Sequence, residues 1–225
     1  MKSNSRSLLA LTLLTAFALA GEKSLAQTAT VSYNGTNTGT TLNLTLPASG
    51  TTNYYAGSLN IDVGGTTFQA FCVDPTEFTT ATSTIYNASS SLVPPFSGAQ
   101  SGWVSNLYSQ SYASSGSSGA TAAAFQIALW ELANDDGVLT TGNVIATNPG
   151  GAIELAAAIL INSAQNQAPG STQYSFSLYT NAGKQDYLVA SVTPVPEPES
   201  YAMLLTGLGF VGVVARRRKG SAVTV

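Results

Sequence analysis

The sequence has no histidine and only one cysteine, Cys72, among its 225 residues. Without histidine the chain has no Cys–His dyad, no Ser–His–Asp triad and no histidine-ligated metal site. Conventional hydrolase chemistry of these kinds is therefore excluded. We predict that the protein is not an enzyme, and that it holds no metal and no cofactor.

Charge is scarce as well, with 8 Lys and Arg residues against 11 Asp and Glu residues in the whole chain. Between Gln27 and Val195 the only basic residue is Lys184. Nucleic-acid binding needs clustered cations, so we exclude it. A carboxylate pair could still hydrolyse glycosides. The clustered candidates are Asp74, Glu77, Glu131, Asp135 and Asp136. Their spacing favours solvated loop and helix-end positions, so a hydrolase ranks last.

The N-terminal segment has the pattern of a secretory signal peptide. Lys2 and Arg6 precede the apolar run from Leu8 to Ala20, and small residues at Ser24 and Ala26 suit cleavage before Gln27. The apolar run is too short to span a membrane as a mature helix. We predict a signal peptide over residues 1–26, with an alternative cleavage site after Ala20.

The C-terminal segment carries a second export-related pattern. An apolar stretch from Tyr201 to Ala215 lies between a Pro-Glu-Pro motif and a basic cluster. The motif residues are Pro196, Glu197, Pro198, Arg216, Arg217 and Arg218. A short apolar helix followed by cations is typical of a membrane segment with its basic end inside. Residues 195–225 resemble a PEP-CTERM sorting signal, which implies recognition by an exosortase in a Gram-negative bacterium. A permanent membrane anchor is the alternative.

The segment between these signals, residues 27–194, has the length of one domain. Leu59, Ile61 and Val63 alternate with polar residues, and Gly64-Gly65 suits a two-residue hairpin turn. The turn length fixes the register. It predicts the pairs Val63–Thr66, Ile61–Phe68, Leu59–Ala70 and Gly57–Cys72, so that Cys72 lies on the apolar face. Gly57 leaves room there for another group to approach.

Helical and strand patterns follow the hairpin. Trp103, Leu107 and Tyr108 recur at helical spacing. A second, Ala-rich helix is expected from a cap at Ser118 or Thr121 to Asn134. The sequence predicts a third helix from Asn148-Pro149 to Pro169-Gly170 and a late hairpin made of 174–178 and 187–192. Residues 76–96 show no readable element.

Cys72 and Gln126 are the two unusual residues of this domain. A lone thiol in an oxidising compartment pairs with another molecule or is oxidised, unless it is hidden. A buried primary amide without partners costs roughly 1–3 kcal/mol. If the Cys72 thiolate attacks the side-chain carbonyl of Gln126 and ammonia leaves, the internal thioester that forms removes both problems. The alternative is a buried structural cysteine and a capped or solvent-facing glutamine.

The residues around this pair carry a resemblance. An aromatic residue, Phe71, precedes Cys72, and Gln126 lies between Phe125 and a tryptophan, Trp130, one helical turn later. This sequence pattern resembles that of the internal thioester domains of Gram-positive surface adhesins, although the spacing between cysteine and glutamine is shorter here. The resemblance implies an α+β fold, in which a β-rich, sandwich-like core carries a helical insertion and the bond joins the two. Phe71, Phe125, Trp130 and Gly57 would then support the Cys72–Gln126 bond.

The resemblance implies a secreted protein that binds its target covalently, with Cys72 as the leaving thiol and Gln126 as the acyl donor. The partner would be an amine- or hydroxyl-bearing protein or polysaccharide. A domain almost free of lysine would not cross-link to itself, although secreted proteins rich in Ser and Thr are commonly poor in charge. We expect the cell surface, outer membrane or extracellular matrix of a Gram-negative bacterium as the location. The alternative is a non-covalent carbohydrate-binding or structural module of the biofilm matrix.

Overall fold

The computed structural model describes residues 27–46, 50–146, 151–168, 173–193, 203–211 and 216. The predicted signal peptide and the Pro-Glu-Pro motif lie outside these residues. The strands are β1 (Gln27–Leu46), β2 (Gly50–Val63), β3 (Thr66–Cys72), β4 (Thr84–Ser89), β5 (Ile145–Ala146), β6 (Tyr174–Asn181) and β7 (Lys184–Val192). The helices of the domain are α1 (Gly98–Ser115), α2 (Gly119–Asn134) and α3 (Ala152–Asn166).

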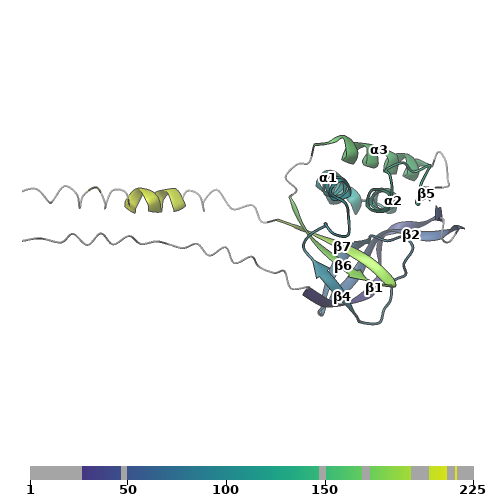
Figure 1. Ribbon diagram of the computed structural model, residues 1–225, viewed down its shortest axis with the longest axis horizontal. Helices are drawn as coiled ribbons and strands as arrows, with labels where there is room; N and C mark the ends of the chain where they lie inside the picture. Colours follow the sequence, from purple (N-terminus) through teal and green to yellow (C-terminus); the bar gives the residue numbers. More distant parts are fainter. Residues whose placement is uncertain are drawn as a thin grey trace, which may run out of the picture.

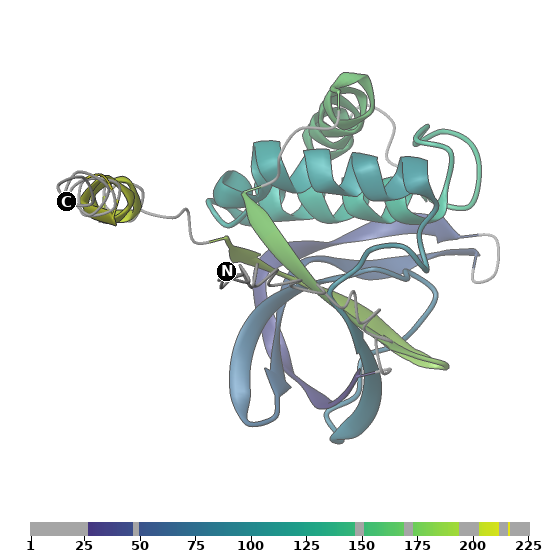
Figure 2. The same ribbon diagram turned by 60° about the vertical axis from the view of Figure 1, so that its left-hand side comes forward.

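The strands form one antiparallel sheet in the order β2-β3-β7-β6-β4-β1-β5. Strand β1 also pairs with β2, so six of the strands close into a ring and β5 extends β1 beyond it. The ring is visible below the helices in Figure 2. The α+β class and the β-rich core were predicted correctly. The sandwich-like arrangement was not, because the long β1 pairs with β4 near its start and with β2 over the rest of its length.

The helices form a layer on one side of the sheet, as an insertion between β4 and β6 (Figure 1). Helices α1 and α2 lie over the strands, and α3 lies on their far side from the sheet (Figures 1 and 2). Helix α2 begins at Ser118, whose hydroxyl accepts from Thr121 N–H in a capping box. It ends at Asn134. The predicted bounds of this helix are confirmed.

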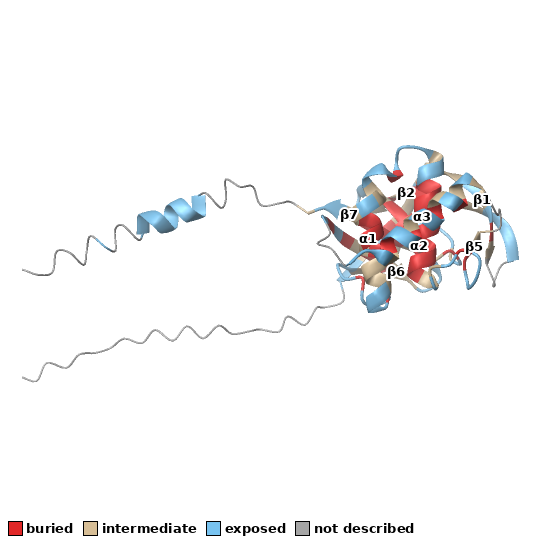
Figure 3. Cartoon of the chain, turned by 90° about the horizontal axis from the view of Figure 1, so that it is seen from above, coloured by how far each residue is buried: buried red, intermediate tan, exposed pale blue. Residues whose placement is uncertain are grey.

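Helix α2 is buried on all sides, from Ala122 to Ala133. Figure 3 shows it largely in red, below the exposed faces of α3. The position of α2 between the sheet and the other helices buries its whole circumference. A glutamine in this helix therefore has no route to solvent and must find its partners inside the protein.

The hairpin of β2 and β3 has the predicted register, with Val63 opposite Thr66, Ile61 opposite Phe68 and Leu59 opposite Ala70. The ladder ends one pair early, at Ser58–Phe71. The predicted pair Gly57–Cys72 does not form, although Gly57 keeps its partner Gly39 on the other edge of β2. Gly57 does allow a close approach, but by the backbone of β1: a Cβ atom there would lie 2.3 Å from Thr38 O.

Replacement of Gly57 by alanine is expected to destabilise the domain by more than about 3 kcal/mol, since the added methyl group meets backbone at a φ of +151°. Gly64→Ala is the control, because Gly64 has a φ of +57° and open space around it. It should cost only about 1–2 kcal/mol. Urea unfolding of both variants measures the difference. Equal losses would contradict the close approach.

Other elements differ from the predictions. Neither the long strand β1, with 20 residues, nor β4 was predicted. Helix α3 begins at Ala152, and the predicted start at Asn148-Pro149 lies outside the described residues. The late hairpin is confirmed, with β7 beginning at Lys184.

In the C-terminal segment, residues 203–211 are helical and exposed. Among the residues that the structure describes, none of the helices combines the length and hydropathy that a membrane crossing needs. The predicted membrane segment extends beyond these residues at both ends and stays a prediction.

Candidate functional site

The site forms at the end of β3, where one edge of the strand loses its neighbour. In this register the main-chain N–H and C=O of every second residue point toward β2, and Cys72 is one of these residues. On the opposite edge, Cys72 lies across from Tyr187 of β7. Because the ladder between β2 and β3 ends at Ser58–Phe71, the N–H and C=O of Cys72 need another partner.

Gln126 of α2 supplies that partner. Its Oε1 accepts a hydrogen bond of 3.0 Å from Cys72 N–H, and its Nε2 donates one of 2.8 Å to Cys72 O. The carboxamide thus takes the place of a strand neighbour. The carbon Cδ is bonded to both of these atoms, so the two hydrogen bonds hold it against the Cys72 main chain. The structure brings together the two residues that the sequence singled out, 54 positions apart.

Aromatic residues surround this pair. Phe71 and Phe125, each directly before one member of the pair, are fully buried and their ring centroids lie 4.7 Å apart. Tyr108 of α1 packs edge-on against Phe125 at 5.0 Å. Such packing excludes water from the neighbourhood of the carboxamide.

Asn134, one further residue of α2, fixes the backbone beyond Cys72. Its Nδ2 donates to Val73 O at 2.7 Å, while Val73 N–H donates to Asp186 O of β7 at 2.9 Å. Gln126, Trp130 and Asn134 are spaced by four and share one face of the helix. That spacing was available in the sequence, but no role was predicted for Asn134.

Trp130 lies one turn after Gln126, and only 2% of its surface is exposed. Its ring packs edge-on against Tyr54 of β2, with the centroids 6.5 Å apart. Its Nε1–H is buried and has no hydrogen-bond partner. Trp130 therefore closes the space between α2 and β2 on the side of the helix that carries Gln126.

The pair is shielded from solvent. Gln126 is 0% exposed and Cys72 is 7% exposed. Burial raises the pKa of the Cys72 thiol well above its usual range. The thiol is therefore neutral at physiological pH, and an external reagent reaches neither group without a local opening.

Asp186 beside the site has a pKa raised to about 7, by burial first and then by Glu77 and Asp74. A carboxyl group with a raised pKa favours the folded state below its unfolded pKa, and this contribution is lost as pH rises through about 7. We expect stability to fall by about 1–2 kcal/mol from pH 4 to pH 8, after allowance for partial solvent exposure.

Asp186→Asn should flatten this part of the profile, because asparagine still accepts from Asn181 N–H without titrating. Thermal unfolding between pH 4 and pH 8 in EDTA measures it. An unchanged profile in the variant would show that Asp186 does not titrate in this range.

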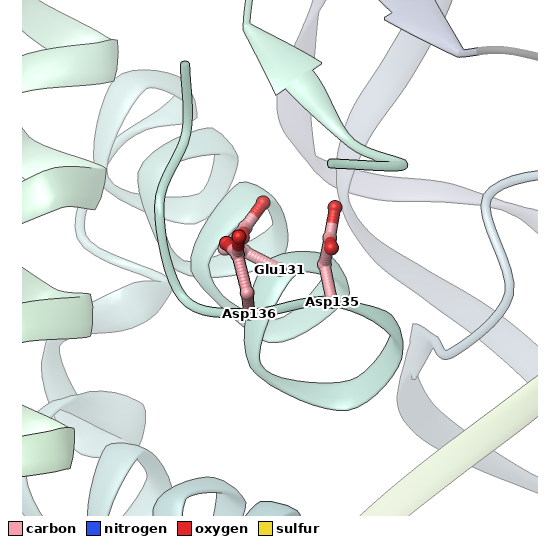
Figure 4. A group of neighbouring side chains, drawn as sticks. All are labelled: Glu131, Asp135 and Asp136. Carbon is pink, nitrogen blue, oxygen red and sulfur yellow. The ribbon is translucent and has the colours of Figure 1, made fainter. Parts of the chain in front are cut away.

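The five acidic residues considered from the sequence do not form one cluster. Asp74 and Glu77 lie in the segment that follows β3, whereas Glu131, Asp135 and Asp136 gather at the end of α2 (Figure 4). Glu131 was expected to be solvated at a helix end, but it is 0% exposed. Its Oε1 accepts from Gly137 N–H at 2.9 Å and Val138 N–H at 2.8 Å, because the loop folds back over the helix.

Comparison with known proteins identifies the C-terminal segment. Residues 194–219 match the PEP-CTERM protein-sorting motif, which confirms the predicted sorting signal. The matched range contains both the Pro-Glu-Pro motif and the basic cluster. No curated protein matches the sequence.

Two solved structures are similar to the chain. One is the N-terminal thioester domain of a surface protein from Clostridium perfringens, with 13% identity and a TM-score of 0.41, covering 74% of this chain and 100% of that one. The other is the N-terminal domain of the pilus tip adhesin Cpa from Streptococcus pyogenes, with 15% identity and a TM-score of 0.37, covering 63% of this chain and 85% of that one. At these values, what the site does must be inferred from its own geometry.

Proposed function

We propose that Cys72 and Gln126 form an internal thioester and that the protein is a covalent adhesin. The observation that carries the proposal is the double hydrogen bond between the Gln126 carboxamide and the Cys72 main chain in a buried, aromatic-lined site. The acyl carbon is thereby held beside the residue that carries the nucleophile. Such positioning supplies effective molarities of up to ~10⁵–10⁸ M.

Formation of the thioester needs no group beyond the two side chains. Cys72 Sγ bonds to Gln126 Cδ, the Cδ–Nε2 bond breaks, and the thiol proton leaves with the nitrogen as ammonia. Negative charge develops on Oε1 during the attack, and Cys72 N–H already donates to that oxygen at 3.0 Å. This donor is the electrostatic stabilisation that a poorly reactive amide requires.

Capture of the target opens the thioester again. An amine on the target attacks Cδ, the Cδ–Sγ bond breaks, and Sγ takes the proton from the attacking nitrogen. The product is an amide between Gln126 and the target together with a free Cys72 thiol. There is no turnover, so the protein is not an enzyme. Lys184, the only amine-bearing side chain between residues 27 and 195, is exposed at the start of β7.

The sorting motif indicates where the protein acts. It implies processing by an exosortase and supports an exported, cell-surface protein of a Gram-negative bacterium. A covalent bond to a neighbouring surface or matrix polymer would survive conditions that dissociate a non-covalent adhesin. The target itself would be an amine- or hydroxyl-bearing protein or polysaccharide.

A fluorescent primary amine tests the proposal. After incubation with dansylcadaverine, peptide mapping should place the label on Gln126 and a newly reactive thiol on Cys72. Cys72→Ala should take up no label. Label distributed over other residues, or none at Gln126 even when the site is loosened with mild denaturant, would contradict the proposal.

One observation favours the alternative of carbohydrate binding. A hollow of about 740 Å³ lies between β1, β2 and the start of α3. Its lining includes the polar residues Thr40, Thr41, Asn43, Thr51 and Glu154. If the amine test fails, this hollow is the place to look for non-covalent binding of a matrix polysaccharide.

A further inference from the structure

Three carboxylates come together where α2 ends and the following loop begins. One oxygen from each of Glu131, Asp135 and Asp136 lies within 4.8 Å of the others. Figure 4 shows the three side chains on one side of the helix end, directed toward the loop that folds back over it. The sequence predicted no metal site, because it offers no histidine and these residues read as solvated.

Glu131 gives the independent sign that a ligand belongs here. The residue is 0% exposed, and its Oε1 accepts from two backbone N–H groups of the loop. Its Oε2 is also buried but has no hydrogen-bond partner. A buried carboxylate oxygen without a partner is strongly unfavourable unless a cation compensates it.

No cation of the domain is placed to do so. The last turn of α2 contains no basic residue, and the carboxylates lie at the negative end of the helix dipole. Lys184 is the only basic residue between residues 27 and 195, and it is exposed at the start of β7.

We propose that Glu131, Asp135 and Asp136 bind one Ca²⁺ ion. Ca²⁺ takes oxygen ligands at about 2.3–2.6 Å, so oxygens within 4.8 Å of one another can share a single ion. The site has no nitrogen or sulfur ligand, which disfavours Zn²⁺ and other transition metals. Ca²⁺ also tolerates irregular geometry, whereas Mg²⁺ demands a near-ideal octahedron. The proposal is independent of the thioester.

Binding would fix the loop to the end of α2. Asp135 also accepts hydrogen bonds from the backbone N–H groups of Asn143 and Val144, at the far end of the same loop. An ion shared by the three carboxylates therefore links the helix end, the start of the loop and its return. With three carboxylates and partial exposure, we expect a Kd of about 0.1–1 mM, the range of extracellular Ca²⁺ modules.

Thermal unfolding of the purified, EDTA-stripped full chain tests the site. Addition of 10 mM CaCl₂, at ~ten to a hundred times the expected Kd, should raise the Tm by about 5 °C, whereas MgCl₂ at equal ionic strength should raise it much less. Isothermal titration should give one Ca²⁺ per chain. The absence of a Ca²⁺-dependent shift, or an equal shift with Mg²⁺, would overturn the proposal.

Glu131→Gln is the decisive variant, because glutamine keeps the acceptor for Gly137 and Val138 but loses the charge. It should fold and lose the Ca²⁺ shift. Asp136→Asn, at an exposed ligand, should weaken Ca²⁺ binding by about tenfold. Asp62→Asn removes a carboxylate from the β2–β3 hairpin and should retain the full shift. If Asp62→Asn lost the shift as well, or if Glu131→Gln retained it, Ca²⁺ would not act at this cluster.

Discussion

Replacement of Cys72 by alanine is expected to lower the free energy of unfolding by roughly 4 kcal/mol. A bond between residues 54 positions apart closes a long loop in the unfolded chain, and the loop-entropy relation gives about this value. In the variant Gln126 keeps its carboxamide and makes both hydrogen bonds to the main chain at position 72, whereas thioester formation in the wild type removes Nε2 and leaves only the bond to Oε1. A merely structural cysteine would cost about 1 kcal/mol, the order of a lost methylene-sized group.

Gln126→Ala should cost more than Cys72→Ala. It removes the same cross-link and also the carboxamide that pairs the main chain in Cys72→Ala, so the buried N–H and C=O of residue 72 both lack a partner, at about 1–3 kcal/mol for each group. Gln110→Ala makes the same substitution at an exposed position of α1, where it breaks no cross-link and leaves no buried main-chain group unpaired. It should leave the free energy of unfolding nearly unchanged. Urea unfolding of the three variants gives the order. Cys72→Ala within 1 kcal/mol of the wild type would argue against the cross-link.

Replacement of Trp130 by alanine is expected to accelerate methylamine addition at Gln126 at least tenfold, on the order of 1.4 kcal/mol in the barrier. The indole fills the space between α2 and Tyr54, and its removal admits water and amine to a site that is otherwise closed. Trp130→Phe should change the rate much less. It should also be only slightly destabilising, because it removes a buried N–H that has no partner.

A general loosening of the core must be separated from this local effect. Tyr86→Ala removes a buried ring from β4. The free energy of unfolding should fall by about 3–5 kcal/mol, a loss comparable to that expected for Trp130→Ala. Tyr86→Ala should leave the rate of methylamine addition near that of the wild type, measured by mass well below the unfolding temperature. Equal acceleration in both variants would mean that global opening, not Trp130, controls access.

The parts of the fold that were predictable from sequence depend on local signals. The Gly64-Gly65 turn fixes the register of β2 and β3. Helix α2 begins after the Ser118 cap and ends before Asp135-Asp136-Gly137. By contrast, the closure of the sheet depends on the path of β1, which pairs both with the next strand, β2, and with the more distant β4. Strand β4 was missed because only Tyr86 is buried in it, whereas Ile85 is 68% exposed.

The candidate site shows the same division. Cys72 and Gln126 were identified because a lone thiol and a glutamine on an apolar helix are chemically unusual. How they meet was not predictable, because the register placed Gly57 where Gln126 lies. The ladder between β2 and β3 ends at Ser58–Phe71, which no local signal marks, and this end leaves the unpaired strand edge that the carboxamide occupies. The burial of Glu131 likewise depends on a loop that returns over the helix end.

The intact mass of the purified chain, with its ends fixed by peptide mapping, tests the thioester most directly. We predict a mass lower than that of the sequence by one ammonia, a deficit that is absent in Cys72→Ala and in Gln126→Ala. Methylamine treatment of the wild type should then add one methylamine and expose one titratable thiol. A full sequence mass, with a thiol that reacts on unfolding without any amine, would contradict the thioester and leave Cys72 and Gln126 as a structural pair.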